Sequence, residues 1–249
     1  RGRLARAILF VAAFVLMGLI YAAAHEVLDE GGFHASVAGV ITALGLIATG
    51  VIAAAPITSE KEARSWPILL ATPMSARQIV TGKLLGTLRR VLPLWGLLTF
   101  HLLLFVVAGV LHPLVLPLVA VAVAWATLFL SCTGLLLGVL MRKTTTAVMA
   151  NLGVGLVLWV IGPILLNLAD IEYWNGAQHY FNSIPPYQVG LLTYGSAWES
   201  WGYAPFDLQF DSLGPGTTFL YVLAYAVGYG LLLMSCFLAA VRLVRRRIF

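Results

Sequence analysis

Six long runs of apolar residues, separated by shorter polar segments, organise the whole chain. Each run contains no Asp, Glu, Lys or Arg, and each is close to the ~20 residues that a helix needs to cross a bilayer. The apolar positions are continuous rather than alternating, and backbone polar groups in lipid must be satisfied within the segment. The pattern therefore predicts an all-α integral membrane protein, with residues 1–249 forming a single transmembrane domain. The predicted spans are residues 7–24, 36–57, 91–111, 114–140, 147–168 and 217–241.

The charged residues alternate between the two sides of these predicted spans. All fifteen Lys and Arg residues fall in four clusters, at residues 1–6, 61–90, 142–143 and 242–247. The intervening loops lack Lys and Arg and carry eight of the ten carboxylates. Because positive charge near span ends is retained in the cytoplasm, we expect both termini to be cytoplasmic, in a multi-pass protein of the plasma (inner) membrane.

Composition excludes several other classes of protein. The chain is 61% hydrophobic and 10% charged, whereas soluble domains are about 25% charged. The net charge of +5 does not indicate nucleic-acid binding, because the basic clusters alternate with spans. Cys132 and Cys236 both lie within spans, so we expect buried thiols and neither a disulfide nor a metal site. Spans without ionisable carboxylates or amines also disfavour an ion-coupled transporter.

The first apolar run has an alternative interpretation as a cleavable signal peptide, because basic residues precede it and alanines end it. Its 18 residues exceed the ~7–15 of a typical signal-peptide core, so a first transmembrane helix is favoured. The chain starts with Arg1 rather than Met, and we expect a short segment before it.

The inner loop, residues 58–90, is predicted to be more than a connection. Ser59 with Glu62 three residues later matches a capping box, which predicts that a short helix begins there. Pro73 should interrupt the chain, and Ser75 should cap a second helix that continues into the third span. An interfacial amphipathic helix that only anchors the protein is the alternative.

The outer loop, residues 169–216, holds 11 of the 28 aromatic residues. Such density beside spans predicts short helices at the outer interface. Trp174, Tyr187, Trp198 and Trp201 are candidates for an outer gate on the path of a hydrophobic substrate. The alternative is an aromatic belt that anchors the chain at the interface.

Two polar residues within the spans, His101 and Asn151, are candidates for the translocation path. The alternative is that each forms a hydrogen bond with a neighbouring helix. The sequence has no P-loop, no H-E-x-x-H metal motif and no G-x-S-x-G elbow. An intramembrane enzyme is therefore disfavoured. Gly134 and Gly138, four residues apart in the fourth span, predict a close helix approach, which is weak evidence for a dimer.

The inner loop resembles the signature of type-2 ATP-binding-cassette exporter permeases. In that family a G-E-K-E-x-G-T-x-E-x-L-L-x-T-P-x-S-x-x-E-I-x-x-G-K pattern joins the second and third spans. The six-span layout, the long outer segment before the last span and the basic, Thr-rich link near residues 138–146 are also similar. The matching residues are SEKEAR at 59–64, LLATPMSARQI at 69–79 and GKLL at 82–85.

The resemblance implies a permease subunit that is not itself an enzyme and binds no cofactor directly. Two permeases, identical or related, would pair in the membrane, and each would dock on a cytoplasmic ATPase subunit that binds ATP and Mg²⁺. A coupling helix between spans two and three would transmit ATP-driven motion and so export a hydrophobic or amphipathic substrate. The implied ATPase-coupling residues are Glu60, Lys61, Glu62, Arg64, Trp66, Leu69, Leu70, Thr72 and Pro73.

The chain departs from the family pattern at two places. Ser59 replaces a glycine, and Ser65-Trp66-Pro67 lacks the usual acidic residue. Trp66 is therefore predicted to fill an apolar groove on the ATPase. The alternative function is a membrane-embedded scaffold, an assembly or maturation factor, or an intramembrane enzyme, without ATP-driven transport.

Overall fold

The computed structural model describes residues 2–168, 180–197 and 215–244, and every regular element in these ranges is helical. Within these ranges, five helical segments are long and apolar enough to cross a membrane. The all-α prediction is confirmed, and five of the six spans have a long helix. The first helix, α1 (Gly2–Ala23), has a shorter apolar part, Val11–Ala23, so its crossing stays a prediction. The five are Gly31–Glu62, Ala76–Val107, Val115–Leu140, Thr144–Leu168 and Phe219–Leu243.

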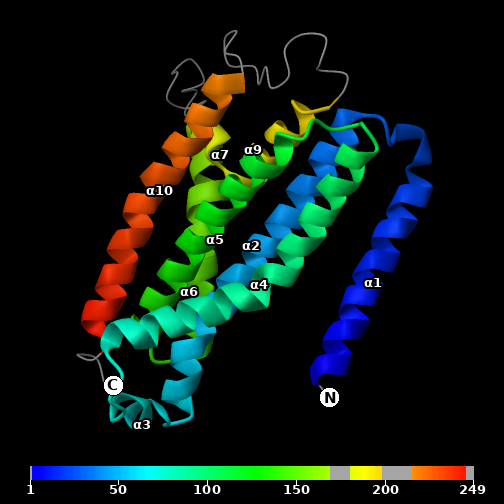
Figure 1. The fold of residues 1–249 in the computed structure, drawn as a ribbon. Helices are drawn as coiled ribbons and strands as arrows, with labels where there is room; N and C mark the ends of the chain where they lie inside the picture. The colour runs from blue at the N-terminus through cyan, green and yellow to red at the C-terminus, as the bar shows by residue number, and fades with distance from the viewer. Residues whose placement is uncertain (1, 169–179, 198–214, 245–249) are drawn as a thin grey trace.

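The helices stand roughly side by side, with α5 (Val115–Leu140) at the centre of the bundle (Figure 1). It packs against α2 (Gly31–Glu62), α4 (Ala76–Val107) and α10 (Pro215–Leu243). The N-terminal end of α1 and the C-terminal end of α10 lie at one end of the bundle, together with the short α3 (Trp66–Leu70). We call this end the inner end. That both termini lie in the cytoplasm stays a prediction.

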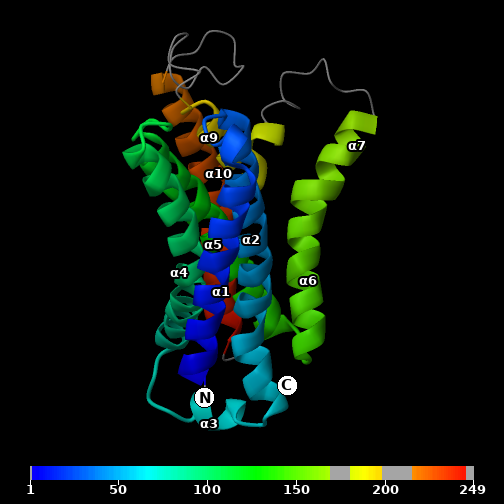
Figure 2. The same ribbon diagram turned by 90° about the vertical axis from the view of Figure 1, so that its right-hand side faces the viewer.

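Two parts of the chain lie at the edges of this central group. Figure 2 shows α6 (Thr144–Leu156) and α7 (Gly162–Leu168) to one side, while α1 stands apart in Figure 1. A π-helical turn, Val157–Ile161, joins α6 to α7, and it leaves the Leu158 carbonyl without its usual helical donor. The Tyr180 hydroxyl donates to that carbonyl, which ties the segment before α9 (Pro185–Tyr194) to this span.

Small residues allow α2 and α5 to approach closely. A Cβ atom added at Gly134 would lie 2.8 Å from the Ala53 Cβ, and one at Gly138 would lie 3.2 Å from the Ala54 carbonyl oxygen. The close approach predicted for these two glycines is therefore confirmed, and it occurs within one chain.

The inner loop is largely helical, and one predicted boundary in it is wrong. Ser59 does not cap a new helix, because α2 continues without interruption to Glu62. Ser75 does cap α4: its hydroxyl accepts from the Gln78 N–H at 3.2 Å, and the Gln78 side chain accepts from the Ser75 N–H at 2.7 Å. The third span is therefore continuous with residues that hydropathy assigned to the loop.

Pro93 lies inside α4, where it removes a backbone donor and its ring crowds the carbonyl of Arg89. Figure 1 shows α4 changing direction along its length. Its first half crosses the inner part of the bundle obliquely, and its second half runs alongside α2. A prolyl kink is the physical reason for such a change of direction.

Candidate functional site

A tight turn after α2 carries the chain into α3. The Arg64 N–H donates to the Lys61 carbonyl at 3.1 Å, and the Ser65 N–H donates to the Glu60 carbonyl at 3.0 Å. This pair of bonds is a Schellman motif, in which the residue after the C-cap adopts the left-handed region. Here that residue is Arg64, with φ of 55° and an exposed side chain. The chain therefore reverses at once, and α3 begins two residues later.

Trp66 anchors α3 to the bundle. Its side chain is 1% exposed and packs in an inner apolar cluster built from α2, α4, α5 and α10. The prediction that Trp66 fills a groove on another protein is wrong for this structure, because the chain itself covers the indole. The other buried members of the cluster are Ile57, Ile79, Val80, Leu135, Val139, Ala240 and Val244.

The opposite side of the α3 segment is exposed and apolar. Ile68 is 71% exposed and Met74 is 39% exposed, whereas Leu69 packs partly against the inner cluster. Pro73 is exposed in the turn to α4, and the Thr72 hydroxyl closes that turn by donating to the Leu69 carbonyl at 2.6 Å. We call the exposed side chains the α3 edge. They are Pro67, Ile68, Ala71, Pro73 and Met74. Leu70, also predicted as a coupling residue, is the last residue of α3.

Glu60 and Lys83 join α2 to α4 at the inner end. They form an ion pair, and the Lys83 ammonium also donates to the Pro56 carbonyl at 3.3 Å. Both side chains are partly buried. Glu60, predicted to face an ATPase, is thus engaged within the chain.

Lys61 reaches the C-terminal end of α5. Its ammonium donates to the carbonyls of Gly138 at 3.0 Å, Val139 at 2.7 Å and Met141 at 3.0 Å. The last carbonyls of a helix lack intrahelical donors and carry partial negative charge. Lys61 therefore provides donors for the last carbonyls of α5, and its positive charge complements the negative end of that helix's dipole.

Glu62 reaches the N-terminal end of α6. Its carboxylate accepts from the Thr144 N–H at 2.8 Å and from the Thr144 hydroxyl at 2.9 Å. The side chain lies in the last turn of α2, beyond its apolar part, and is exposed. The Thr144 N–H, followed by the Thr144 hydroxyl, holds the pKa of the Glu62 carboxyl below its usual range. The carboxylate is thus charged at neutral pH, and its bonds weaken only as the pH falls through that lowered pKa.

His101 and Asn151 both bond to neighbouring helices. His101 is fully buried and pairs with the Tyr21 hydroxyl of α1 through Nδ1. Asn151 donates to the carbonyls of Gly50 at 2.9 Å and Leu130 at 3.2 Å, and it accepts from the Thr133 hydroxyl at 2.8 Å. These contacts match the alternative interpretation of the two residues as links between helices. A role in a translocation path stays a prediction.

The outer-gate residues are only partly covered by the structure. Tyr187 lies in α9 and is 50% exposed. The other three candidates, Trp174, Trp198 and Trp201, lie outside the described residues.

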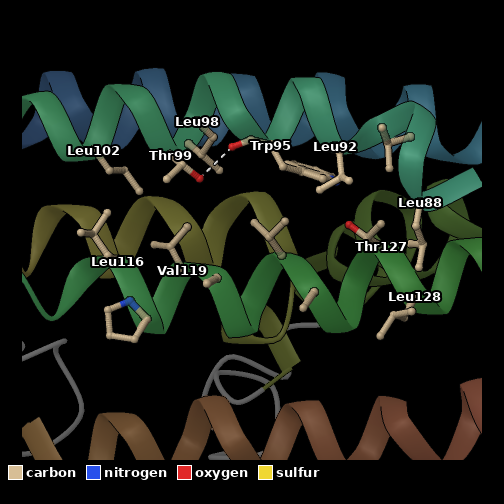
Figure 3. Close-up of a pocket in the computed structure, with 15 residues that line it drawn as sticks. Leu88, Leu92, Trp95, Leu98, Thr99, Leu102, Leu116, Val119, Thr127 and Leu128 are labelled. Carbon is tan, nitrogen blue, oxygen red and sulfur yellow. Dashed lines mark hydrogen bonds between the residues drawn. The ribbon is translucent and has the colours of Figure 1, made fainter. Parts of the chain in front are cut away.

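A groove between α4 and α5, with a volume of about 740 Å³, was not predicted from the sequence (Figure 3). Its walls are almost wholly apolar, with Leu98 on α4 facing Val119 on α5. Thr127 lines it, and its buried hydroxyl makes no hydrogen bond with the described part of the chain. Hydropathy cannot find such a groove, because it depends on how two helices diverge.

Within the described residues, no group of three or more His, Cys, Asp or Glu side chains could hold a metal ion. The inner end offers a fixed short helix with an apolar edge, and charged groups that tie helix ends together.

A search of curated proteins finds no match to the chain. The family described as ABC-2 family transporter protein matches residues 6–245. Since the match covers nearly the whole chain, this membrane protein belongs to the ABC-2 family of transporters, as a transmembrane permease component.

Proposed function

We propose that the chain is the permease subunit of an ATP-driven exporter and that the α3 edge docks on a separate ATPase subunit. The observation that carries this proposal is the two-sided placement of α3. Trp66 is buried in the bundle, while Ile68 on the same short helix is 71% exposed. Together with the exposed Pro67 and Ala71, Ile68 forms a contiguous apolar edge beyond the spans, and such an edge suits burial against a protein partner.

Family membership supports this division of labour, and the sequence itself contains no P-loop that would bind ATP. ATP and Mg²⁺ bind to the ATPase subunits, one on each of two paired permeases. Closure of the ATPase dimer pushes α3. Because Trp66 packs α3 into the inner cluster, α3 moves together with the bundle. The capped start of α4 receives the push with little slack, since only residues 71–75 separate it from α3. The spans then rock between inward-facing and outward-facing states.

This proposal places both termini and α3 in the cytoplasm and the protein in the plasma membrane, in contact with lipid. The substrate is hydrophobic or amphipathic. The apolar groove between α4 and α5 and the aromatic content of residues 169–216 support this choice of substrate class.

Replacement of Ile68 by Asp tests the docking surface. A carboxylate in an apolar contact is costly to bury, so Ile68→Asp should abolish association with the ATPase. Ile68→Leu keeps an apolar side chain of equal size and is the matched control. Association is measured by co-purification in mild detergent, followed by ATP hydrolysis of the recovered complex.

The proposal requires that the ATPase be lost from Ile68→Asp while the permease still folds, as monitored by its thermal unfolding. Equal recovery of an active ATPase with both variants would refute docking at the α3 edge. Recovery of no ATPase even with the unchanged chain would favour the scaffold alternative.

A further inference from the structure

The turn between α5 and α6, residues 141–143, has no side chain of its own that caps the start of α6. The N-cap of α6 is Lys143, which provides no side-chain cap, and Arg142 precedes it. Positive charge at a helix N-terminus opposes the helix dipole. The turn therefore depends on groups from elsewhere for its missing hydrogen bonds.

Two adjacent residues of α2 supply these bonds. Lys61 donates to three carbonyls at the end of α5, and Glu62 accepts from two donors of Thr144 at the start of α6. Each charge has the sign that its helix end favours: a cation at a C-terminus and an anion at an N-terminus. An exchange of the two residues would place each charge against the wrong end. The order Lys61-Glu62 is therefore matched to the order of the helix ends that it meets.

We propose that Lys61 and Glu62 are positioning residues that fasten the α5–α6 turn to the inner end of α2. Because Trp66 and the Schellman turn fix α3 to the same end of α2, the fastening joins α3, the end of α2 and the turn into one rigid unit. This inference rests on the proposed function for its role in transport. It deepens that function by assigning the charged motif an internal task.

The consequence concerns how motion spreads from α3. Without the fastening, a push on α3 would reach α5 only through the apolar contacts of the inner cluster around Trp66. With it, the push also reaches the C-terminal end of α5 and the start of α6, at the side of the bundle, through hydrogen bonds (Figure 2). These hydrogen bonds are directional, so they fix the position of the turn relative to the end of α2.

Hydrogen exchange on the purified chain in lipid nanodiscs tests the fastening directly. The Thr144 N–H belongs to the first turn of α6, where no intrahelical acceptor exists, and Glu62 is its acceptor. Glu62→Ala should therefore speed exchange at this amide about tenfold, the factor expected for a bond to a charged acceptor. Arg89→Gln removes an exposed charge from α4 and is the control, with no change expected.

Spin-label distances test whether the parts form one unit. With Cys132 and Cys236 replaced by alanine, labels at Ile68→Cys on α3 and Met149→Cys on α6 should give a narrow distance distribution. Both positions are exposed. Lys61→Met combined with Glu62→Ala should broaden this distribution. Lys61→Arg with native Glu62 should keep it narrow, because the cation remains.

An unchanged, narrow distance between α3 and α6 in the Lys61→Met, Glu62→Ala chain would overturn the inference. Broadening that also affects a pair on α3 and α4, Ile68→Cys with Leu85→Cys, would overturn it too. That result would mean that the whole inner end had loosened rather than the turn alone.

A third measurement separates this inference from the proposed function. In the complex with its ATPase, ATP and vanadate should change the distance from Met149→Cys on α6 to Leu238→Cys on α10. The doubly substituted chain should lose this change, while Leu85→Cys on α4 still moves relative to α10. If ATP moves no label in the unchanged complex, the proposed function fails. The exchange and distance measurements on the permease alone then still decide whether the fastening exists.

Discussion

At the scale of single residues, α2 and α4 end with the same hydrogen-bond pattern but with different residues at its left-handed position. After α4, the Gly109 N–H donates to the Val106 carbonyl and the next N–H to the Phe105 carbonyl, with φ of 80° at Gly109. After α2, Arg64 occupies the equivalent position with φ of 55°. A side chain in this region costs energy that glycine avoids.

Arg64→Gly should therefore stabilise the protein by about 1 kcal/mol. Thermal unfolding in detergent measures the effect. Arg64→Ala removes the same charge and keeps a Cβ atom, so it should give no such gain. Equal stabilisation by both variants would show that the guanidinium, rather than the backbone, is the unfavourable group.

Asn151 is a second residue with a measurable contribution. Its buried amide joins α6 to α2 and α5 through three hydrogen bonds. Such bonds between membrane helices average about 0.6 kcal/mol each, so Asn151→Ala should cost about 2 kcal/mol. Thr133→Val removes one of the three bonds and should cost about a third as much. The free energy of unfolding in a denaturing detergent titration gives both values, and equal losses would contradict the network.

At the scale of elements, the start of α4 depends on its capping box. Ser75→Ala removes the acceptor for the Gln78 N–H and should destabilise the first turn of α4 by about 1 kcal/mol. Faster hydrogen exchange at residues 76–79 measures this local fraying. Ser75→Asp retains an acceptor at the cap and should exchange as slowly as the unchanged chain. Slow exchange in Ser75→Ala would mean that packing of Ile79 alone holds the turn.

Elements that depend on local sequence could be predicted, and those that depend on distant contacts could not. The span cores and the Ser75 cap follow from residues that are neighbours along the chain. The helical end of α2 does not follow from neighbouring residues. Lys61 and Glu62 bond to partners about 80 residues away, at the ends of α5 and α6. The burial of Trp66 is also non-local, because its apolar cluster includes Leu135 on α5 and Ala240 on α10.

At the scale of the whole molecule, the closeness of α2 and α5 decides how tightly the central bundle packs. Gly134 faces Ala53 across this contact, where an added Cβ would lie 2.8 Å away, well inside normal contact distance. Gly153 lies on α6 with nothing within 4 Å of its added Cβ. The two glycines thus provide a matched pair for one substitution in different surroundings.

Gly134→Ala should destabilise the chain by about 1–3 kcal/mol, since overpacking forces the two helices apart. Gly153→Ala should be neutral or stabilising by up to about 1 kcal/mol, because alanine favours the helix. The free energy of unfolding measures both effects, and size-exclusion chromatography in detergent reports the oligomeric state. If Gly134 instead served contact between two chains, Gly134→Ala would weaken the dimer and leave the unfolding of a single chain unchanged. A loss of stability with no change of oligomeric state would establish the glycine as part of the internal contact between α2 and α5.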